Sequence, residues 1–201
     1  MEQIISKEEL EELMKMKEEI RGSAIKNVAI FTLDKRGKEG LRRLEEEIVK
    51  LGYQIKLEEV KEIQLYPLGL AIASLLITKR LFSFSDKDFQ EMGGRSVKLS
   101  IVIRSLMQFL IPFSFEQIIK RLPEIWKRIN PIGELKVVKL DQDERYLILK
   151  LEDYRTHPIQ CQILIGAFSS LIQIISGKKT TCEEIKCIYR GDEYHEFLLK
   201  W

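Results

Sequence analysis

The chain has 201 residues, with 33 Lys and Arg against 31 Asp and Glu and a net charge of +2. Its length suits a single domain, residues 1–201, that buries a core without disulfides. Because both charge signs are mixed along the sequence, we expect no nucleic-acid partner. The longest apolar runs, residues 68–78 and 163–175, are too short to span a bilayer, so they predict core helices and no membrane contact. Three cysteines without a signal peptide favour a cytoplasmic location, and abundant Lys and Glu with two asparagines are thermophile-like.

The N-terminal third predicts helices around one short strand. Ser6, with Glu9 three residues later, forms a capping box that opens a helix within residues 1–22. The narrow apolar stripe of this helix suits docking either on a partner or on the body of the domain. Residues 28–33 predict a strand, and helical spacing predicts a helix over 41–51. Residues 54–65 alternate loosely, and either a strand or a linker fits them.

The middle of the chain predicts helices only. Apolar spacing, capping residues and prolines place them over residues 67–81, 85–94, 96–110 and 112–130. The glycine pair at 93–94 should end the second of these helices. Pro123 should kink or split the last one, since proline removes a backbone donor and clashes with the preceding turn.

The C-terminal part predicts two hairpins with a helix between them. Strands over 134–140 and 146–151 are joined by a polar turn. A helix over 158–176 is closed by a glycine, and a hairpin over 182–200 ends the chain, so that residues 157–200 form a helix-plus-hairpin segment. With the helices before them, these elements predict an α+β fold in which a helical cluster packs on an antiparallel sheet made of two hairpins.

Every thiol of the chain and one of its two histidines lie in this last segment: Cys161, Cys182, Cys187 and His195. Cys187 and His195 are equidistant from Gly191, so in a hairpin they become cross-strand neighbours about 5 Å apart. Thiolates and imidazoles are ligands of four-coordinate zinc. Buried cysteines also pack as small hydrophobic residues without any metal. The spacing alone leaves both interpretations open.

The run from Cys182 to Phe197 resembles the C-terminal signature of the 4-vinyl-reductase domain family. Glu184, Cys187, Gly191 and Phe197 match that signature, and His195 stands where the family has a cysteine. Residues 157–168 are similar to the helix that precedes it. The family is related to transport-particle subunits and to the sensor domains of phenol- and xylene-responsive regulators.

The resemblance implies a fold, a cofactor and a set of ligands. The fold would be the 4-vinyl-reductase or transport-particle type, and the cofactor a structural zinc ion bound by Cys161, Cys182, Cys187 and His195. Glu184 would support the site from outside the ligand set. A zinc ion with four protein ligands has no open position for water or substrate, which argues against catalysis.

The resemblance also implies an apolar ligand pocket between the helices. Aromatic residues ahead of the sheet either fill a core or line such a pocket. The candidate lining residues are Phe84, Phe109, Trp126, Ile165 and Ser169. A run of small residues over 166–170 allows close approach by a second copy of the helix, by the chain's own sheet or by a ligand.

No catalytic constellation and no phosphate loop is present in the sequence, so an enzyme is the less favoured expectation. The leading hypothesis is a stand-alone zinc-containing sensor-type domain that forms a homodimer and binds a small hydrophobic ligand. One alternative is a dimeric adaptor or assembly protein without a ligand. The other is a tetrapyrrole-pathway reductase or accessory protein, which only the family resemblance implies.

Overall fold

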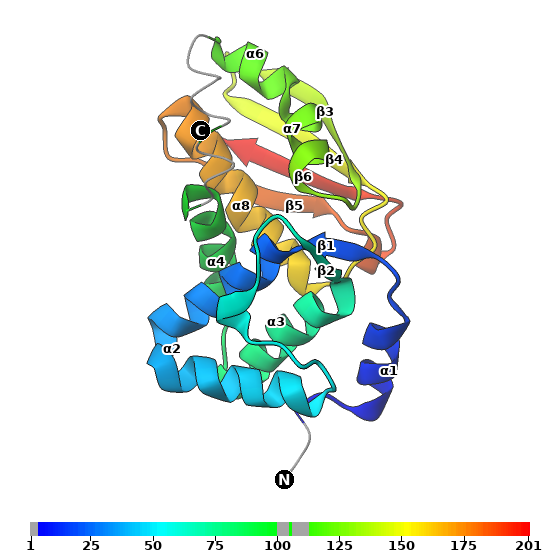
Figure 1. Cartoon of the computed structure of the whole chain (residues 1–201). Coiled ribbons are helices and arrows are strands. Elements are labelled where there is room, and N and C mark those ends of the chain that lie inside the picture. Colours follow the sequence, from blue (N-terminus) through cyan, green and yellow to red (C-terminus); the bar gives the residue numbers. More distant parts are fainter. Residues whose placement is uncertain (1–3, 100–104, 106–112) are drawn as a thin grey trace. The chain divides into compact units, whose positions relative to one another are not determined.

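The computed structural model describes residues 4–99, 105 and 113–201 (Figure 1). The sequence predicts one domain, whereas the structure divides into two compact units, residues 1–88 and 89–201. Each unit is described by itself.

The first unit is a helical cluster with a two-stranded antiparallel sheet. Its core element is α3, in which every residue from Leu68 to Thr78 is buried. The bent helix α2 packs along α3, as Figure 1 shows. The elements in chain order are α1 (Lys7–Lys15), β1 (Glu19–Arg21), α2 (Gly22–Lys50), η1 (Leu57–Glu59), β2 (Leu65–Pro67) and α3 (Leu68–Phe82).

The strand predicted over residues 28–33 is wrong, because this segment lies inside α2. Ile25, Val28, Ala29 and Thr32 are all buried, and their spacing is that of one helix face. The β-branched residues favour a strand locally, but burial against α3 decides the conformation. Gly37 then interrupts the helix with a φ of 67°, which a glycine adopts without strain, and this bend separates the two arms of α2.

Helix α1 docks on the body of the first unit. The predicted capping box is present, since Ser6 Oγ accepts a hydrogen bond from Glu9 N and the Glu9 carboxylate accepts one from Ser6 N. Leu13 is 3% exposed, and a Cβ on Gly69 of α3 would lie 2.2 Å from the Leu13 carbonyl oxygen. The apolar stripe of α1 therefore packs within its own chain. Residues 54–65 form mostly irregular structure around η1.

The second unit is a four-stranded antiparallel sheet with helices on one face, in strand order β3-β4-β6-β5. The α+β class predicted from the sequence is confirmed. Helix α7 contacts β3, and α8 contacts β5 and β6. The elements are α4 (Asp86–Leu99), α6 (Phe115–Lys120), α7 (Leu122–Ile129), β3 (Glu134–Asp141), β4 (Tyr146–Glu152), α8 (Ile159–Ser176), β5 (Thr181–Lys186), η2 (Ile188–Arg190) and β6 (His195–Lys200).

Two of the predicted helix ends have different outcomes. The break at Pro123 is confirmed, since α6 ends at Lys120 and α7 begins at Leu122 with the proline in its first turn. The end predicted at Gly93–Gly94 is wrong, because α4 continues to Leu99. Most of the helix predicted over 96–110 lies outside the described residues.

A glycine on each of the helices α4 and α8 lets the two backbones touch. A Cβ on Gly93 would lie 2.0 Å from the Ile163 carbonyl oxygen, and one on Gly166 would lie 1.8 Å from the Gln90 carbonyl oxygen. Gln90 Nε2 also donates a hydrogen bond to Gln162 Oε1 at 2.8 Å. The run of small residues in α8 thus accommodates α4 of the same chain.

Strand β3 forms one edge of the sheet and carries an irregularity. Its register against β4 shifts between Val137 and Lys139, which leaves Val138 53% exposed. Lys136 pairs with Glu152 of β4, and Lys139 lies 3.7 Å from Asp141. Charged residues therefore flank the bulge on this edge.

Among the described helices, α8 alone is long and apolar enough to cross a membrane, with a mean hydropathy of 1.6. This is weak evidence for a membrane span, because the core helix of a globular unit has the same length and composition and 44% of α8 is buried.

We expect Gly166→Ala to lower the free energy of unfolding by about 2 kcal/mol. The added methyl group meets the Gln90 carbonyl, and overpacking of about 3 kcal/mol outweighs the gain of about 1 kcal/mol in helix propensity. Gly94→Ala is the matched control, since its Cβ would lie 3.4 Å from its nearest neighbour, the Gly166 carbonyl oxygen. Urea unfolding measures both variants. Equal midpoints for the two would contradict the backbone contact.

Candidate metal centre

Among the described residues of the second unit, His195 is the most enclosed polar one. It opens β6, pairs with Leu151 of β4, and is 0% exposed. Its Nδ1 lies 2.8 Å from Glu184 Oε1, and its Nε2 lies 3.3 Å from the carbonyl oxygen of Tyr154. Both ring nitrogens therefore have a polar partner, which a buried imidazole requires.

Two thiols face each other beside this histidine. Cys161 lies in the first turn of α8, and Cys187 directly follows β5. Their sulfur atoms are 3.8 Å apart, and the residues are 5% and 4% exposed. Asp192 Oδ2 accepts a hydrogen bond from Cys187 N at 2.8 Å, and Gly191 turns the chain with a φ of 98°. The loop between β5 and β6 thus holds Cys187 against the start of α8.

The donor atoms of Cys161, Glu184, Cys187 and His195 all lie within 4.8 Å of one another. Thiolate sulfur binds first-row transition metals at about 2.3 Å, so two thiolates on a tetrahedral ion stand about 3.8 Å apart. The observed sulfur separation has this value. The four donor atoms are therefore close enough to bind one metal ion after small side-chain movements.

Three of the four predicted metal ligands converge in this cluster, and Cys182 does not. Cys182 and Glu184 point to the same face of β5 because side chains alternate along a strand. Glu184 is about 7 Å nearer to the loop that carries Cys187. Glu184, which the sequence places outside the ligand set, thus occupies the fourth position. The alternation of side chains along a strand shows from the sequence only that Glu184 shares a face with Cys182.

Burial and negative neighbours determine the acidity of the cluster. Burial raises the pKa of Cys161, and the nearby Glu184 carboxylate and Cys187 sulfur raise it further. Arg190 lies over Glu184, with its guanidinium 3.6 Å from the carboxylate and a hydrogen bond to the Glu184 carbonyl oxygen. Without a cation the Cys161 thiol keeps its proton, and a bound metal ion would replace that proton.

The residues predicted to line a ligand pocket lie in different surroundings. Trp126 Nε1 donates hydrogen bonds to the carbonyl oxygens of residues 132 and 133, and its ring packs against Phe168. Ser169 Oγ donates to the Thr180 carbonyl oxygen at 2.7 Å, and Ile165 is half-buried on α8. Phe84 packs against Phe31 within the first unit. Phe109 lies outside the described residues.

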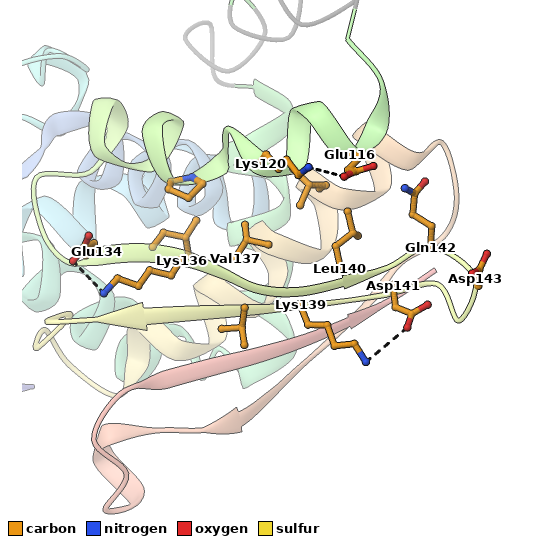
Figure 2. Close-up of a pocket in the computed structure, with 14 residues that line it drawn as sticks. Glu116, Lys120, Glu134, Lys136, Val137, Lys139, Leu140, Asp141, Gln142 and Asp143 are labelled. Atoms are coloured by element: carbon orange, nitrogen blue, oxygen red, sulfur yellow. Dashed lines mark ion pairs between the residues drawn. The ribbon is translucent and has the colours of Figure 1, made fainter.

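A groove between β3 and the helices α6 and α7 contains none of these predicted residues. Figure 2 shows Val137 and Leu140 pointing from β3 towards the helices. Six of its charged side chains form ion pairs: Glu116 with Lys120, Glu134 with Lys136, and Lys139 with Asp141, while Asp143 stands at the end of the groove. The groove therefore offers a ligand no cluster of unpaired charges.

No family model matches the chain, and no curated protein matches it by sequence. Solved structures do match it. An Fe(II) unliganded H-NOX mutant from K. algicida has 12% identity and a TM-score of 0.64, covering 90% of this chain and 96% of that one. An Fe(II)NO H-NOX protein from S. oneidensis has 9% identity and a TM-score of 0.64, covering 90% and 98%. The chain has an H-NOX-like fold. The I5F mutant of T. tengcongensis H-NOX agrees, with 9% identity, a TM-score of 0.62 and coverage of 90% and 97%.

The H-NOX likeness corrects three predictions. Membership of the 4-vinyl-reductase family is wrong, as is the 4-vinyl-reductase or transport-particle type of fold. The prediction of a structural zinc cofactor is also wrong, because the matching structures are named for Fe(II) and for haem distortion in the H-NOX family. At these identities the likeness establishes only the fold. The cofactor of this chain has to be argued from its own residues.

The two histidines and the two facing cysteines are already engaged and offer haem iron no free axial ligand. Haem iron takes an axial ligand from His, Cys, Met or Tyr. Both ring nitrogens of His195 are engaged, and His157 Nδ1 accepts a hydrogen bond from Ile159 N at the start of α8. The sulfurs of Cys161 and Cys187 face each other. The groove at β3 is lined by none of the four ligand types.

We expect the metal-free protein to lose stability between about pH 9 and pH 12, in part through Cys182. Burial raises the pKa of this thiol from 9.0 to about 12. The unfolded chain therefore ionises at lower pH than the folded one, so the contribution is complete below pH 9 and is lost as the pH rises through 12. Chemical unfolding of wild type and Cys182→Ala across this range, with chelator present, should give a shallower fall for the variant. Parallel pH profiles would contradict this assignment.

Proposed function

We propose that this chain is a ligand-binding, sensor-type domain with an H-NOX-like fold whose second unit binds a transition-metal ion directly, without haem. The observation that carries the metal proposal is the convergence of four donors of three kinds within 4.8 Å. The sensor class is supported by the fold alone. No comparison supports the adaptor or tetrapyrrole-reductase alternatives.

The chemistry of the donor set favours a metal over a purely hydrogen-bonded cluster. Two thiols, an imidazole and a carboxylate are buried together, although a thiol is a weak hydrogen-bond partner. The Sγ–Sγ separation equals the edge of a tetrahedron around one ion. Soft sulfur donors with one imidazole select thiophilic transition metals over Mg²⁺ or Ca²⁺.

The assignment of the imidazole nitrogens follows from the hydrogen bonds of His195. Nε2 lies beside the Tyr154 carbonyl oxygen, which accepts only if Nε2 carries a proton. Nδ1 then faces Glu184 and is the nitrogen available to a metal ion. A backbone carbonyl that fixes the second nitrogen is the usual support of a metal-bound histidine.

A metal ion here would join three elements of the second unit. Cys161 comes from α8, Glu184 from β5, and His195 from β6. When bound, the ion supplies electrostatic neutralisation of the thiolates and cross-links these elements. Metal binding free energy then becomes folding free energy for the C-terminal segment.

Three further expectations stay predictions: a small hydrophobic ligand, a homodimer and a cytoplasmic location. The two surfaces that favour a dimer in the sequence, the stripe of α1 and the small residues of α8, pack within the chain. A dimer therefore needs other surfaces than these.

We expect protein purified without added metal to carry about one equivalent of a transition metal per chain, because the donor set is complete and spaced for one ion. Cys187→Ser should lower metal affinity at least about 100-fold, since loss of a ligand exceeds the loss from a supporting group. Chelator should lower the thermal midpoint of the wild type. Elemental analysis over all first-row metals, with a chelator melt, measures both.

Cys182→Ser is the matched control, because it changes the same residue type on the same strand outside the donor cluster. It should retain the metal. Less than about one tenth of an equivalent in the wild type, with no chelator effect on the melt, would remove the proposed metal site.

Titration with haemin should produce no saturable spectral change at one equivalent, since both histidines already make hydrogen bonds. An H-NOX protein treated in parallel is the positive control. A stoichiometric haem complex whose spectrum changes in His157→Ala would contradict the haem-free proposal.

A further inference from the structure

Cys161 and Cys187 are near enough to react with each other. Their sulfur atoms are 3.8 Å apart, whereas Cys182 belongs to no such pair. One thiol stands at the start of a helix and the other at the start of a loop. Both backbones are thus at ends of regular elements, where small adjustments interrupt few hydrogen bonds.

We propose that Cys161 and Cys187 form a redox-active dithiol that hydrogen peroxide converts to a disulfide, and that this oxidation displaces the metal ion. The displacement rests on the proposed metal site. The disulfide itself depends only on the two thiols.

The reaction consumes one peroxide and produces two waters. The Cys187 sulfur attacks one peroxide oxygen, the O–O bond breaks, and the first water leaves with a sulfenic acid formed on Cys187. The Cys161 sulfur then attacks the Cys187 sulfur, the S–O bond breaks, and the second water leaves as the S–S bond forms. Both thiol protons end in the waters. Each sulfur loses one electron, and the peroxide gains two.

Geometry makes the two states of the pair exclude each other. A disulfide requires a sulfur separation of about 2.05 Å, whereas two thiolates on one tetrahedral ion stand about 3.8 Å apart. The sulfurs lose their negative charge on oxidation and are no longer good metal ligands. His195 and Glu184 alone are too few ligands to retain the ion.

The roles of the two sulfurs follow from their positions. Cys187 begins the loop of residues 187–194, whose Tyr189 is 39% exposed, so local opening of this loop admits a small oxidant. Cys161 is held on α8 beneath it and acts as the resolving thiol.

Peptide mapping tests the proposal directly, because trypsin separates the three cysteines into peptides 156–178, 180–186 and 187–190. Full-length protein, stripped of metal with chelator, is treated with hydrogen peroxide, and free thiols are then alkylated. The expected product is peptide 156–178 linked to peptide 187–190, with Cys182 alkylated. Cys182→Ser should give the same link, and Cys161→Ser should leave a sulfenic acid on Cys187 that dimedone traps.

A link through Cys182, a sulfinic or sulfonic acid on Cys187 without a link, or thiols that stay free would each overturn the inference. The wild-type map decides this even if a variant fails to fold. In metal-loaded protein, a chromogenic chelator should detect one ion released per disulfide formed. A disulfide in protein that binds no metal would refute the proposed metal site and the displacement but keep the dithiol. Bound metal with no disulfide would refute the dithiol alone.

Discussion

The backbone contact between α4 and α8 is the constraint on which the second unit depends. Gly93 and Gly166 bring the two helices so close that no side chain fits between them. This contact fixes the rotation of α8 about its axis. The face that carries Cys161, Leu164 and Phe168 is then turned into the core, where the sheet lies. The first of these residues meets the loop after β5, and the candidate metal centre lies there.

The same contact explains why one helix can serve both packing and chemistry. A helix that is apolar all round is buried on several sides. In α8 the small residues face α4, the large apolar residues face the core, and Cys161 stands in the first turn, where the helix meets the β5–β6 loop. The eighteen residues of α8 thus supply a surface for α4, a surface for the core and one candidate metal ligand.

Much of the fold follows from the sequence where a local rule decides. The capping box at Ser6, the break at Pro123 and the C-terminal hairpin depend on neighbouring residues, and each is observed. Prediction fails where tertiary packing decides. Three of the six residues 28–33 are β-branched, yet the segment lies in a helix against α3. The Gly93–Gly94 pair is a contact surface rather than a helix end.

The candidate site shows the same division. Cys187 and His195 are equally distant in sequence from the turn at Gly191. The structure brings their donor atoms within 4.8 Å of each other, as the spacing predicts. Whether Cys182 or Glu184 is the fourth donor depends on the residue at which β5 ends and the loop begins. The spacing of the residues in the sequence does not give this position. The family resemblance covers the right segment but leads to the wrong fold family and cofactor. A fold shared with haem proteins does not determine which donors a chain keeps, and here the histidines are committed elsewhere.

The bulge of β3 has a consequence for the behaviour of the protein at high concentration. An edge strand exposes unpaired backbone groups that can template cross-β aggregation. The register shift at Val138 interrupts that template, and Lys136 and Lys139 place charges on both sides of it. An incoming strand would lose hydrogen bonds at the bulge and bury these charges. The bulge therefore hinders the addition of a further strand at this edge of the sheet. Deleting Val138 would remove the bulge and should favour fibrils over the soluble fold.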